Sequence, residues 1–290
     1  MLNRYFYRFF LTTIFFSIAL FTLYCSKKYL SITNADLAFS SFMPVKIQTL
    51  NIIEQQKRLI VIGDVHGCLN SFERLIEKLD VTAEDVIVLA GDLVAKGPDS
   101  LGVLRKAKEL GALCVRGNHD DEVLRWKKYL NTVTEELLEE SNLPNGLVFG
   151  EHQEIASSLP EELFSYLVSC PVILSVPQYE LLIVHGGVDP TKSLEVQDEY
   201  VVMNIRNILD NGSPTRKTSH GTSWSKIWNR IQSTKEHPTT IVYGHAAVRG
   251  LSVKPYSIGL DTGCVKGKEL TAMMFPSKEL ISVKCHKHDL

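Results

Sequence analysis

Five short segments of the sequence place carboxylate, amide or imidazole side chains directly after apolar runs. They are GDVHG at 63–67, GD at 91–92, GNHD at 117–120, HGG at 185–187 and YGH at 243–245. A single segment of this kind is more often a turn than a functional site. Five in one chain, each with oxygen or nitrogen atoms that bind metals, indicate that their side chains meet in one place.

The apolar runs that precede these motifs are predicted to be short buried strands of an α/β fold. Strands are expected at 58–64, 86–92 and 112–120, with helices between them. Strands and helices that alternate in this way pair in parallel through helical crossovers. Further strands are expected at 172–176, 180–187, 239–245, 256–263 and 269–275. The predicted architecture is a sandwich of two β-sheets flanked by helices, and ligands bind at the carboxyl ends of such strands, where the motifs lie.

The order of the five motifs resembles that of the metallophosphatases of the phosphoprotein phosphatase superfamily, and most closely their diadenosine-tetraphosphatase-like branch. The resemblance covers roughly residues 58–276 and implies the calcineurin-like metallophosphatase fold. GDLVAKGP at 91–98 and GLDTGCV at 259–265 resemble fungal members of that branch. Those members include a membrane-anchored vacuolar endopolyphosphatase, so the resemblance extends to this kind of enzyme.

This resemblance implies a centre of two divalent metal ions. Six side chains would hold them, with Asp92 bridging both ions: Asp64 and His66 at the first ion, and Asn118, His185 and His245 at the second. Such ligands suit Mn, Fe, Co or Zn rather than a thiolate site, and the choice among these metals stays open. A hydroxide that bridges two such ions attacks phosphorus without a Ser or Cys nucleophile.

The same resemblance assigns catalytic roles beside the metal ligands. His119 would donate a proton to the leaving oxygen, with Asp120 orienting its ring. Arg116, just before GNHD, would bind the substrate phosphate and stabilise its developing charge. The histidines outside the motifs are predicted to be surface or structural residues: His152, His220, His237, His286 and His288.

One departure from the family pattern concerns substrate choice. The protein-phosphatase branch has Asp and Arg in its GDxxDRG motif, where this chain has Ala95 and Lys96. Lys96 keeps the charge for substrate binding but not the planar bidentate fork of arginine, which disfavours phosphoprotein substrates. Arg249, four residues after His245, is a further candidate for substrate binding on spacing alone.

Composition and charge are those of a globular protein, with 44% apolar and 22% charged residues. The formal net charge of −2 implies no specific nucleic-acid partner. Residues 211–268 nevertheless carry nine Lys or Arg against two acids, a net charge of +7, which is either solvated surface charge or a polyanion-binding region. The six cysteines show no CxxC pattern and no regular spacing, so a disulfide framework is not expected.

The N-terminus contains 18 uncharged residues at 9–26, close to the roughly 20 needed to span a bilayer. An uncleaved single-pass signal anchor is favoured over a cleaved signal peptide or a buried core helix. The predicted division is an anchor segment at 1–28, a stalk at 29–57 and a catalytic domain at 58–290. The anchor would attach the protein to a membrane, and the resemblance places the catalytic domain in the vacuolar lumen, with another endomembrane compartment as the alternative.

The sequence thus predicts an enzyme that hydrolyses phosphoanhydride bonds with two divalent metal ions. The favoured substrate is inorganic polyphosphate, cut internally, mainly because of the resemblance to the membrane-anchored endopolyphosphatase. The predicted anchor agrees with that resemblance, and the +7 region would attract a polyanion. A dinucleoside tetraphosphate or a capped RNA end fits the motifs equally well and remains the alternative. A phosphoprotein substrate and a membrane-tethered pseudophosphatase are less favoured, and protein partners are unknown.

Overall fold

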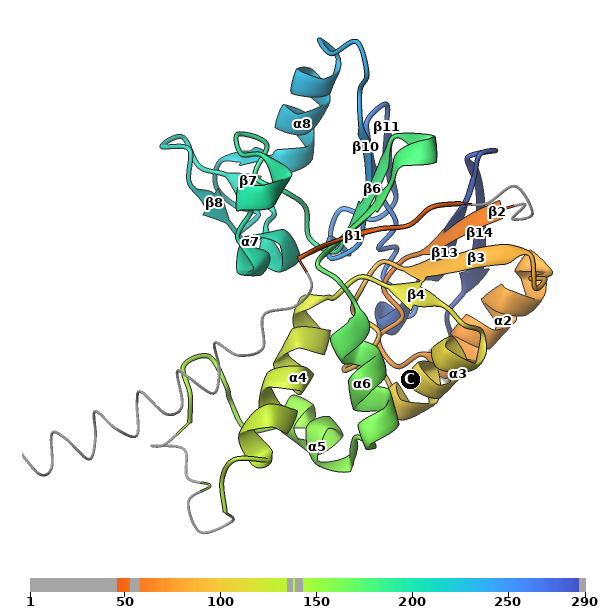
Figure 1. Cartoon of the computed structure of the whole chain (residues 1–290), viewed down its shortest axis with the longest axis vertical. Helices are drawn as coiled ribbons and strands as arrows, with labels where there is room; N and C mark the ends of the chain where they lie inside the picture. Colours follow the sequence, from red (N-terminus) through yellow and green to blue (C-terminus); the bar gives the residue numbers. More distant parts are fainter. Residues whose placement is uncertain (1–45, 53–57, 135–137, 139–142, 287–290) are drawn as a thin grey trace, which may run out of the picture. The chain divides into compact units, whose positions relative to one another are not determined.

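The structure, a computed structural model, describes residues 46–52, 58–134, 138 and 143–286 (Figure 1). Residues 44–143 and 147–290 group into one compact unit, to which all the elements below belong. The predicted membrane span at 9–26 lies outside the described residues. Among the helices that are described, none combines the length and the apolar character needed to cross a bilayer.

A five-stranded sheet carries the first three motifs. Its order is β14-β13-β2-β3-β4. The strands span Arg58–Ile62 (β2), Asp85–Leu89 (β3), Leu113–Cys114 (β4), Glu269–Phe275 (β13) and Glu279–Lys284 (β14). The crossover helices α2 (Leu69–Leu79) and α3 (Ser100–Glu109) connect β2, β3 and β4, which pair in parallel as predicted. The parallel pairing places the exits of these strands at one edge.

A six-stranded sheet carries the last two motifs, in the order β1-β5-β6-β10-β12-β11. Its strands span Ile47–Thr49 (β1), Ile173–Val176 (β5), Leu181–Val184 (β6), Thr240–Tyr243 (β10), Ser252–Lys254 (β11) and Ser257–Gly259 (β12). The 3₁₀ turn Pro177–Tyr179 closes the predicted β5–β6 hairpin. Residues 47–49, expected in the stalk, instead pair with β5, so this sheet begins upstream of residue 58.

The alternation of side chains along the strands builds the sandwich. Leu59 and Val61 of β2 enter a core shared with residues of the six-stranded sheet, such as Ile183. Ile60 and Ile62 point to the opposite face, into a core that includes side chains of α2 and α3. Successive side chains of a strand face opposite sides, so each strand serves both layers. The predicted sandwich of two sheets flanked by helices is confirmed.

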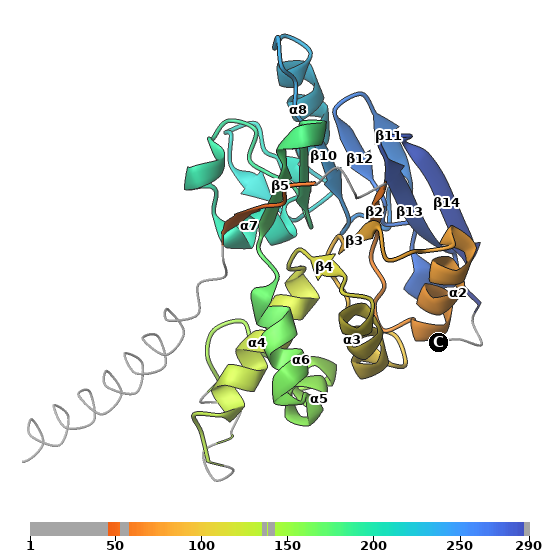
Figure 2. The same cartoon turned by 45° about the vertical axis from the view of Figure 1, so that its right-hand side comes forward.

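The remaining helices lie on the outside of the two sheets (Figures 1 and 2). Three helices follow β4 in the sequence: α4 (Asn118–Leu130), α5 (Glu151–Ser158) and α6 (Glu161–Ser169). Trp224 and Trp228 of α8 (Trp224–Gln232) are buried against the six-stranded sheet. Short elements complete the fold: α7 (Glu199–Asn204), 3₁₀ turns at Leu194–Val196 and Cys264–Lys266, and a small sheet of β7 (Asn207–Ile208), β8 (Pro214–Thr215) and β9 (Thr222–Ser223).

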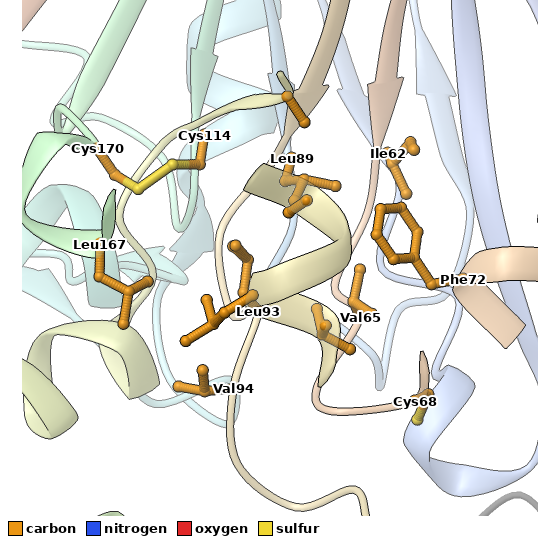
Figure 3. Close-up of a cluster of buried hydrophobic side chains, with 14 of the residues drawn as sticks. Ile62, Val65, Cys68, Phe72, Leu89, Leu93, Val94, Cys114, Leu167 and Cys170 are labelled. Carbon is orange, nitrogen blue, oxygen red and sulfur yellow. A yellow bond between two sulfur atoms is a disulfide. The ribbon is translucent and has the colours of Figure 1, made fainter. Parts of the chain in front are cut away.

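Two disulfides connect these elements, and the expectation that there would be none was wrong. Cys114 at the end of β4 is bonded to Cys170 at the end of α6 (Figure 3). Cys264 is bonded to Cys285. The cysteines of each pair are far apart in sequence and meet only in the folded chain, which is why their spacing gave no signal. The first disulfide ties α6 to the strand that leads into the GNHD motif.

An ion pair between β2 and β3 supplies a test of the sheet. Arg58 donates two hydrogen bonds to Asp85, at 2.8 and 2.6 Å, and these hydrogen bonds lower the pKa of Asp85. We expect Asp85→Asn to reduce the free energy of unfolding by about 1.5–3 kcal/mol at pH 7, measured by urea denaturation.

The folded state holds the pKa of Asp85 below its unfolded value of about 3.9. The stabilisation is therefore complete above about pH 4 and is lost as the pH falls further. The exposed Glu73→Gln on α2 removes the same charge and serves as the control. Equal stability of the two variants at pH 7 would show that the ion pair contributes nothing.

Candidate metal centre

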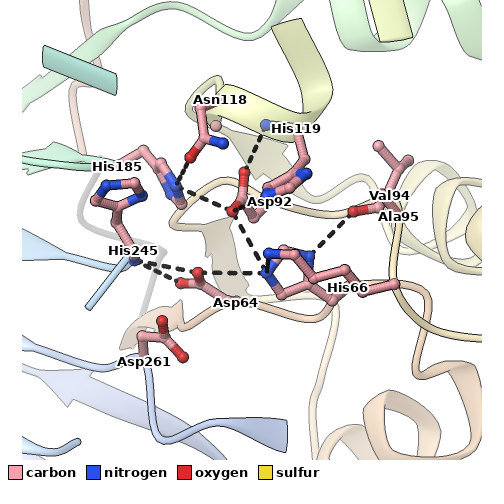
Figure 4. A network of polar contacts seen from close by, with 12 residues as sticks. Asp64, His66, Asp92, Val94, Ala95, Asn118, His119, His185, His245 and Asp261 are labelled. Carbon is pink, nitrogen blue, oxygen red and sulfur yellow. Dashed lines mark hydrogen bonds and ion pairs between the residues drawn. The ribbon is translucent and has the colours of Figure 1, made fainter. Parts of the chain in front are cut away.

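The strand exits bring the predicted ligands together around Asp92 (Figure 4). Asp92 Oδ2 lies 3.2 Å from His185 Nε2 and 3.4 Å from His66 Nε2. Asn118 Oδ1 lies 3.2 Å from His185 Nε2, and Asp64 Oδ2 lies 3.9 Å from His66 Nε2. Side chains from four loops, far apart in sequence, therefore converge on one carboxylate.

Two groups of ligand atoms in this cluster are compact enough to hold an ion each. Asp92, His185 and His245 form one group, in which the atoms lie within 4.8 Å of one another. Asp92, His66 and His119 form the other group, and their ligand atoms also lie within 4.8 Å of one another. Asp92 belongs to both, as expected of a bridging ligand. His119 lies beside the second group and is not needed as its ligand, because Asp64, the ligand that the sequence predicted there, has Oδ2 3.9 Å from His66 Nε2.

The orientation of the histidines suits metal binding. His66 Nδ1 lies 3.1 Å from Val94 O, and His185 Nδ1 lies 2.9 Å from Ala90 O. A carbonyl accepts only an N–H, so Nδ1 of each ring donates there and Nε2 is the nitrogen that faces Asp92 and is available to an ion. His245 is held the other way, with Nε2 3.1 Å from Asn204 O, which leaves Nδ1 for the ion. Metal-ligating histidines are commonly fixed by such second contacts.

The charges in the cluster favour the binding of cations. Asp64 and Asp261 are buried, and burial together with the charge of Asp261 raises the pKa of Asp64 well above its ordinary value. Burial alone would raise the pKa of Asp92 too, but the His185 and His66 imidazoles outweigh it and hold this pKa well below its ordinary value. Buried carboxylates of this kind are stable only beside positive charge. The donor set and its charge therefore fit divalent metal ions.

The backbone at the motifs adopts conformations that few residues tolerate. His66, Asp92 and His245 have φ values of 49°, 52° and 66°. Residues other than glycine rarely adopt this left-handed backbone conformation because it is strained. Backbone strain of this kind is concentrated at functional sites. Gly91 has a φ of 87°, and a Cβ there would lie 2.7 Å from His185 Nδ1. The glycine before Asp92 is thus required by both conformation and space.

The predicted substrate-binding residues differ in their placement. The ammonium of Lys96 reaches the cluster, with Nζ 3.1 Å from His66 Nε2. Arg116 is only 1% exposed, and its guanidinium donates to Val168 O and pairs with Asp121. That burial leaves Arg116 no surface for a substrate phosphate, so its predicted role in binding and catalysis is corrected to a structural one. Arg249 is partly buried and donates to Asn207 Oδ1 and Ser223 Oγ.

Asp120 does not orient the ring of His119, which corrects a second expectation. Its carboxylate is fully buried and accepts hydrogen bonds from the backbone amides of four residues: Asp92, Leu93, Val94 and Gly117. Burial and the charge of Asp92 raise the pKa of Asp120 to about 6. The His119 ring contacts His152 instead, at 2.7 Å between Nδ1 and Nε2. Asp120 therefore holds the loop that carries Asp92. His152, predicted to be a surface or structural residue, contacts the His119 ring at the site.

Two residues at the site were missed in the sequence. Asp261 follows β12 in GLDTG, so its position at a strand exit was a usable signal. Arg206 donates to His245 O at 3.1 Å, and no motif marks it. Arg206 adds a cation beside the predicted ligands.

Comparison with known proteins defines the family. The family model described as calcineurin-like phosphoesterase matches residues 57–272. The chain therefore belongs to the calcineurin-like phosphoesterases, which are enzymes that use divalent metal ions.

Among the similar proteins are bis(5'-nucleosyl)-tetraphosphatases of two kinds. The symmetrical enzyme of Janthinobacterium sp. (strain Marseille) is 28% identical, over 78% of this chain and 96% of its own length. The asymmetrical enzyme PrpE of Halalkalibacterium halodurans is 31% identical, over 77% of this chain and 92% of its own.

Solved structures agree with this assignment. The crystal structure of a putative diadenosine tetraphosphatase superposes with a TM-score of 0.70 at 34% identity, over 84% of this chain and 99% of that one. A protein serine/threonine phosphatase from Saccharomyces cerevisiae, at 17% identity and a TM-score of 0.52, covers 90% of each chain and shares the fold. The predicted diadenosine-tetraphosphatase-like relationship is thus confirmed, whereas these comparisons do not bear out the likeness to endopolyphosphatases.

The close approach at Gly91 allows a direct test of the metal centre. We expect Gly91→Ala to displace the His185 ring and to weaken metal binding by about 10- to 100-fold. Metal content per chain after loading with Mn or Zn and desalting, measured by mass spectrometry, would report this loss.

Gly111→Ala is the matched control. Gly111 also has a positive φ, 61°, but a Cβ there meets nothing within 4 Å. This variant therefore carries the same kind of backbone strain and should keep its metal. Full metal content in Gly91→Ala would mean that the His185 position is not needed for binding.

Proposed function

We propose that the chain hydrolyses a phosphoanhydride bond of a nucleoside polyphosphate, of the dinucleoside tetraphosphate class. The observation that carries the proposal is the pair of ligand groups that share Asp92, within a chain whose relatives are named bis(5'-nucleosyl)-tetraphosphatases. Those relatives match over more than nine-tenths of their own length, so the likeness includes the whole of their fold. This substrate was the alternative in the sequence-based prediction, and it is now preferred to polyphosphate.

The side chains of the centre divide the work of hydrolysis. Divalent ions held by the motif residues, when bound, polarise the phosphoryl group and activate water. Lys96, with its ammonium beside His66, is placed to neutralise charge that develops on the phosphate oxygens. His119 lies next to the ligand Asn118, and its Nε2 is 4.0 Å from Asp92 Oδ2, on the side where a leaving oxygen would take up a proton. The buried carboxylates fix the ligands and keep the geometry unchanged during the reaction.

Inorganic polyphosphate is the second candidate, because a group of five cations lies near the site. They are Arg206, which donates to His245 O, with Arg216, Lys226, Arg249 and Lys254. Burial lowers the pKa of Arg206, and the nearby Arg249 and Arg216 guanidinium groups lower it further. Burial likewise lowers the pKa of Lys254, and Arg249 and Lys226 lower it further. Within the part of the chain that the structure describes, none of these five side chains forms an ion pair with a carboxylate. A long polyanion that extends from the metal centre past these five cations would meet positive charge.

We also propose that the catalytic unit works in an oxidising compartment, such as the lumen of a vacuole. Two disulfides support this, because disulfides persist mainly outside the cytosol. The apolar run at 9–26 supports it as a signal anchor that would attach the chain to the membrane.

One assay separates the two substrates. The full chain, loaded with Mn or Zn, is incubated with diadenosine tetraphosphate and, in parallel, with long-chain polyphosphate. We expect nucleotide products on ion-exchange chromatography, and a rate at least about 100-fold lower for Asp92→Asn, which loses the charge of the shared ligand. The same variant serves as the control for contaminating phosphatases.

Intact diadenosine tetraphosphate would contradict the proposal. If polyphosphate were then cut into mid-length fragments, the second candidate would replace it, and Lys226→Gln with Lys254→Gln should slow that cleavage. Arg105→Gln, an exposed cation on α3, is the control for lost charge elsewhere.

A further inference from the structure

The partner of the His119 ring is an imidazole from another helix. His119 is the second residue of α4, and His152 is the second residue of α5. His119 Nδ1 lies 2.7 Å from His152 Nε2, and the two ring planes are only 15° apart. We propose that His152 is a positioning residue, which holds the His119 ring with Nε2 toward the metal centre, and that Glu122 holds His152 in turn. This inference rests on the proposed phosphoanhydride hydrolysis.

The contact determines which edge of His119 faces the site. It uses Nδ1 whichever of the two rings donates the hydrogen, so Nε2 is left on the opposite edge. Nε2 lies 4.0 Å from Asp92 Oδ2, and the His66 ring stands edge-on to His119 at 5.1 Å between centroids. The ring is therefore held between His152 and the metal-binding residues.

His152 is itself held from two directions. Glu122 Oε1 lies 3.6 Å from His152 Nδ1, an ion-pair distance that is longer than a hydrogen bond. Glu122 follows His119 by three residues on α4, so the two side chains share one face of that helix. The neighbouring Glu151 accepts a hydrogen bond from the backbone amide of Lys96, which ties the start of α5 to the loop after β3. The His152 side chain is 18% exposed and so is largely enclosed.

The residue expected to perform this task does not perform it. The Asp120 carboxylate is occupied by backbone amides. Among the described residues, no carboxylate lies within hydrogen-bonding distance of His119 Nδ1. His152 thus provides the orientation that the motif residues leave open.

The consequence for the reaction concerns one proton. As the bond between phosphorus and the leaving oxygen breaks, its electron pair stays on that oxygen, which takes the proton from His119 Nε2. That proton is present when His152 Nε2–H donates to His119 Nδ1, which leaves the His119 proton on Nε2. A ring that rotates freely presents Nε2 for only part of the time, so orientation contributes to the rate. The contribution is largest when the leaving oxygen is strongly basic.

The test compares two substrates that differ in this respect. The full chain, loaded with Zn, is assayed with phenyl phosphate and with p-nitrophenyl phosphate, whose leaving group needs little help from an acid. We expect His152→Ala to lower kcat by about 10- to 100-fold on phenyl phosphate and by less than about threefold on p-nitrophenyl phosphate, with KM unchanged. His152→Gln, whose amide can still meet Nδ1, should recover much of the rate.

Three further measurements separate positioning from a structural effect. His119→Ala with His152→Ala should be no slower than His119→Ala alone, because the two residues act as one unit. Bound Zn should be unchanged in His152→Ala, and His237→Ala, at an 82% exposed histidine, should behave as wild type. An equal loss of rate on both substrates, an additive double variant or a loss of Zn would each overturn the proposal.

A spectroscopic readout is independent of the substrate. Imidazole ¹⁵N shifts of the Zn-loaded protein should show the His119 Nδ1 signal move in His152→Ala and remain near its wild-type value in His152→Gln. This shift is expected even if the chain hydrolyses none of the phosphate substrates, in which case the proposed function fails and the positioning contact stands. An unchanged Nδ1 signal in His152→Ala would overturn the contact itself.

Discussion

The structure depends on one buried carboxylate that must be shared. Asp92 is 2% exposed, and three imidazoles lie close to its oxygens. A buried carboxylate is stable only where positive charge or hydrogen bonds compensate it. Here the compensation comes from imidazoles, two of which are fixed by backbone carbonyls, and from the ions they are arranged to bind. The position of Asp92 therefore determines where the loops after β2, β3, β4 and β6 meet.

The fold accommodates this cluster through the backbone as much as through the side chains. The left-handed conformations at His66, Asp92 and His245 turn the chain sharply where the strands end. The buried Asp120 binds the loop that carries Asp92, and the disulfide at Cys114 fixes the strand that leads into GNHD. Strained turns persist only where the surrounding structure holds them. The sandwich is thus a rigid support for a site made entirely of loops and one helix start.

The sequence was most informative where local rules decide the structure. Short continuous apolar runs located β2, β3 and β10, and the motifs at their ends located the cluster. It failed where contacts depend on distant segments. The three residues of β1 form a strand only because they pair with β5. His152 comes from a helix that no motif marks. Asp120 was misread because adjacent residues on a helix point in different directions, so it cannot face the ring of His119.

The sharing of Asp92 is best tested by the anomalous scattering of crystals loaded with Mn or Zn, measured at the metal's absorption edge. We expect two peaks with Asp92 between them, one beside His66 and the other beside His185, His245 and Asn118. The second peak should lie on the Nε2 side of His185 and the Nδ1 side of His245, as their backbone contacts require. A single peak, or two peaks that do not share Asp92, would show that Asp92 does not bridge two ions.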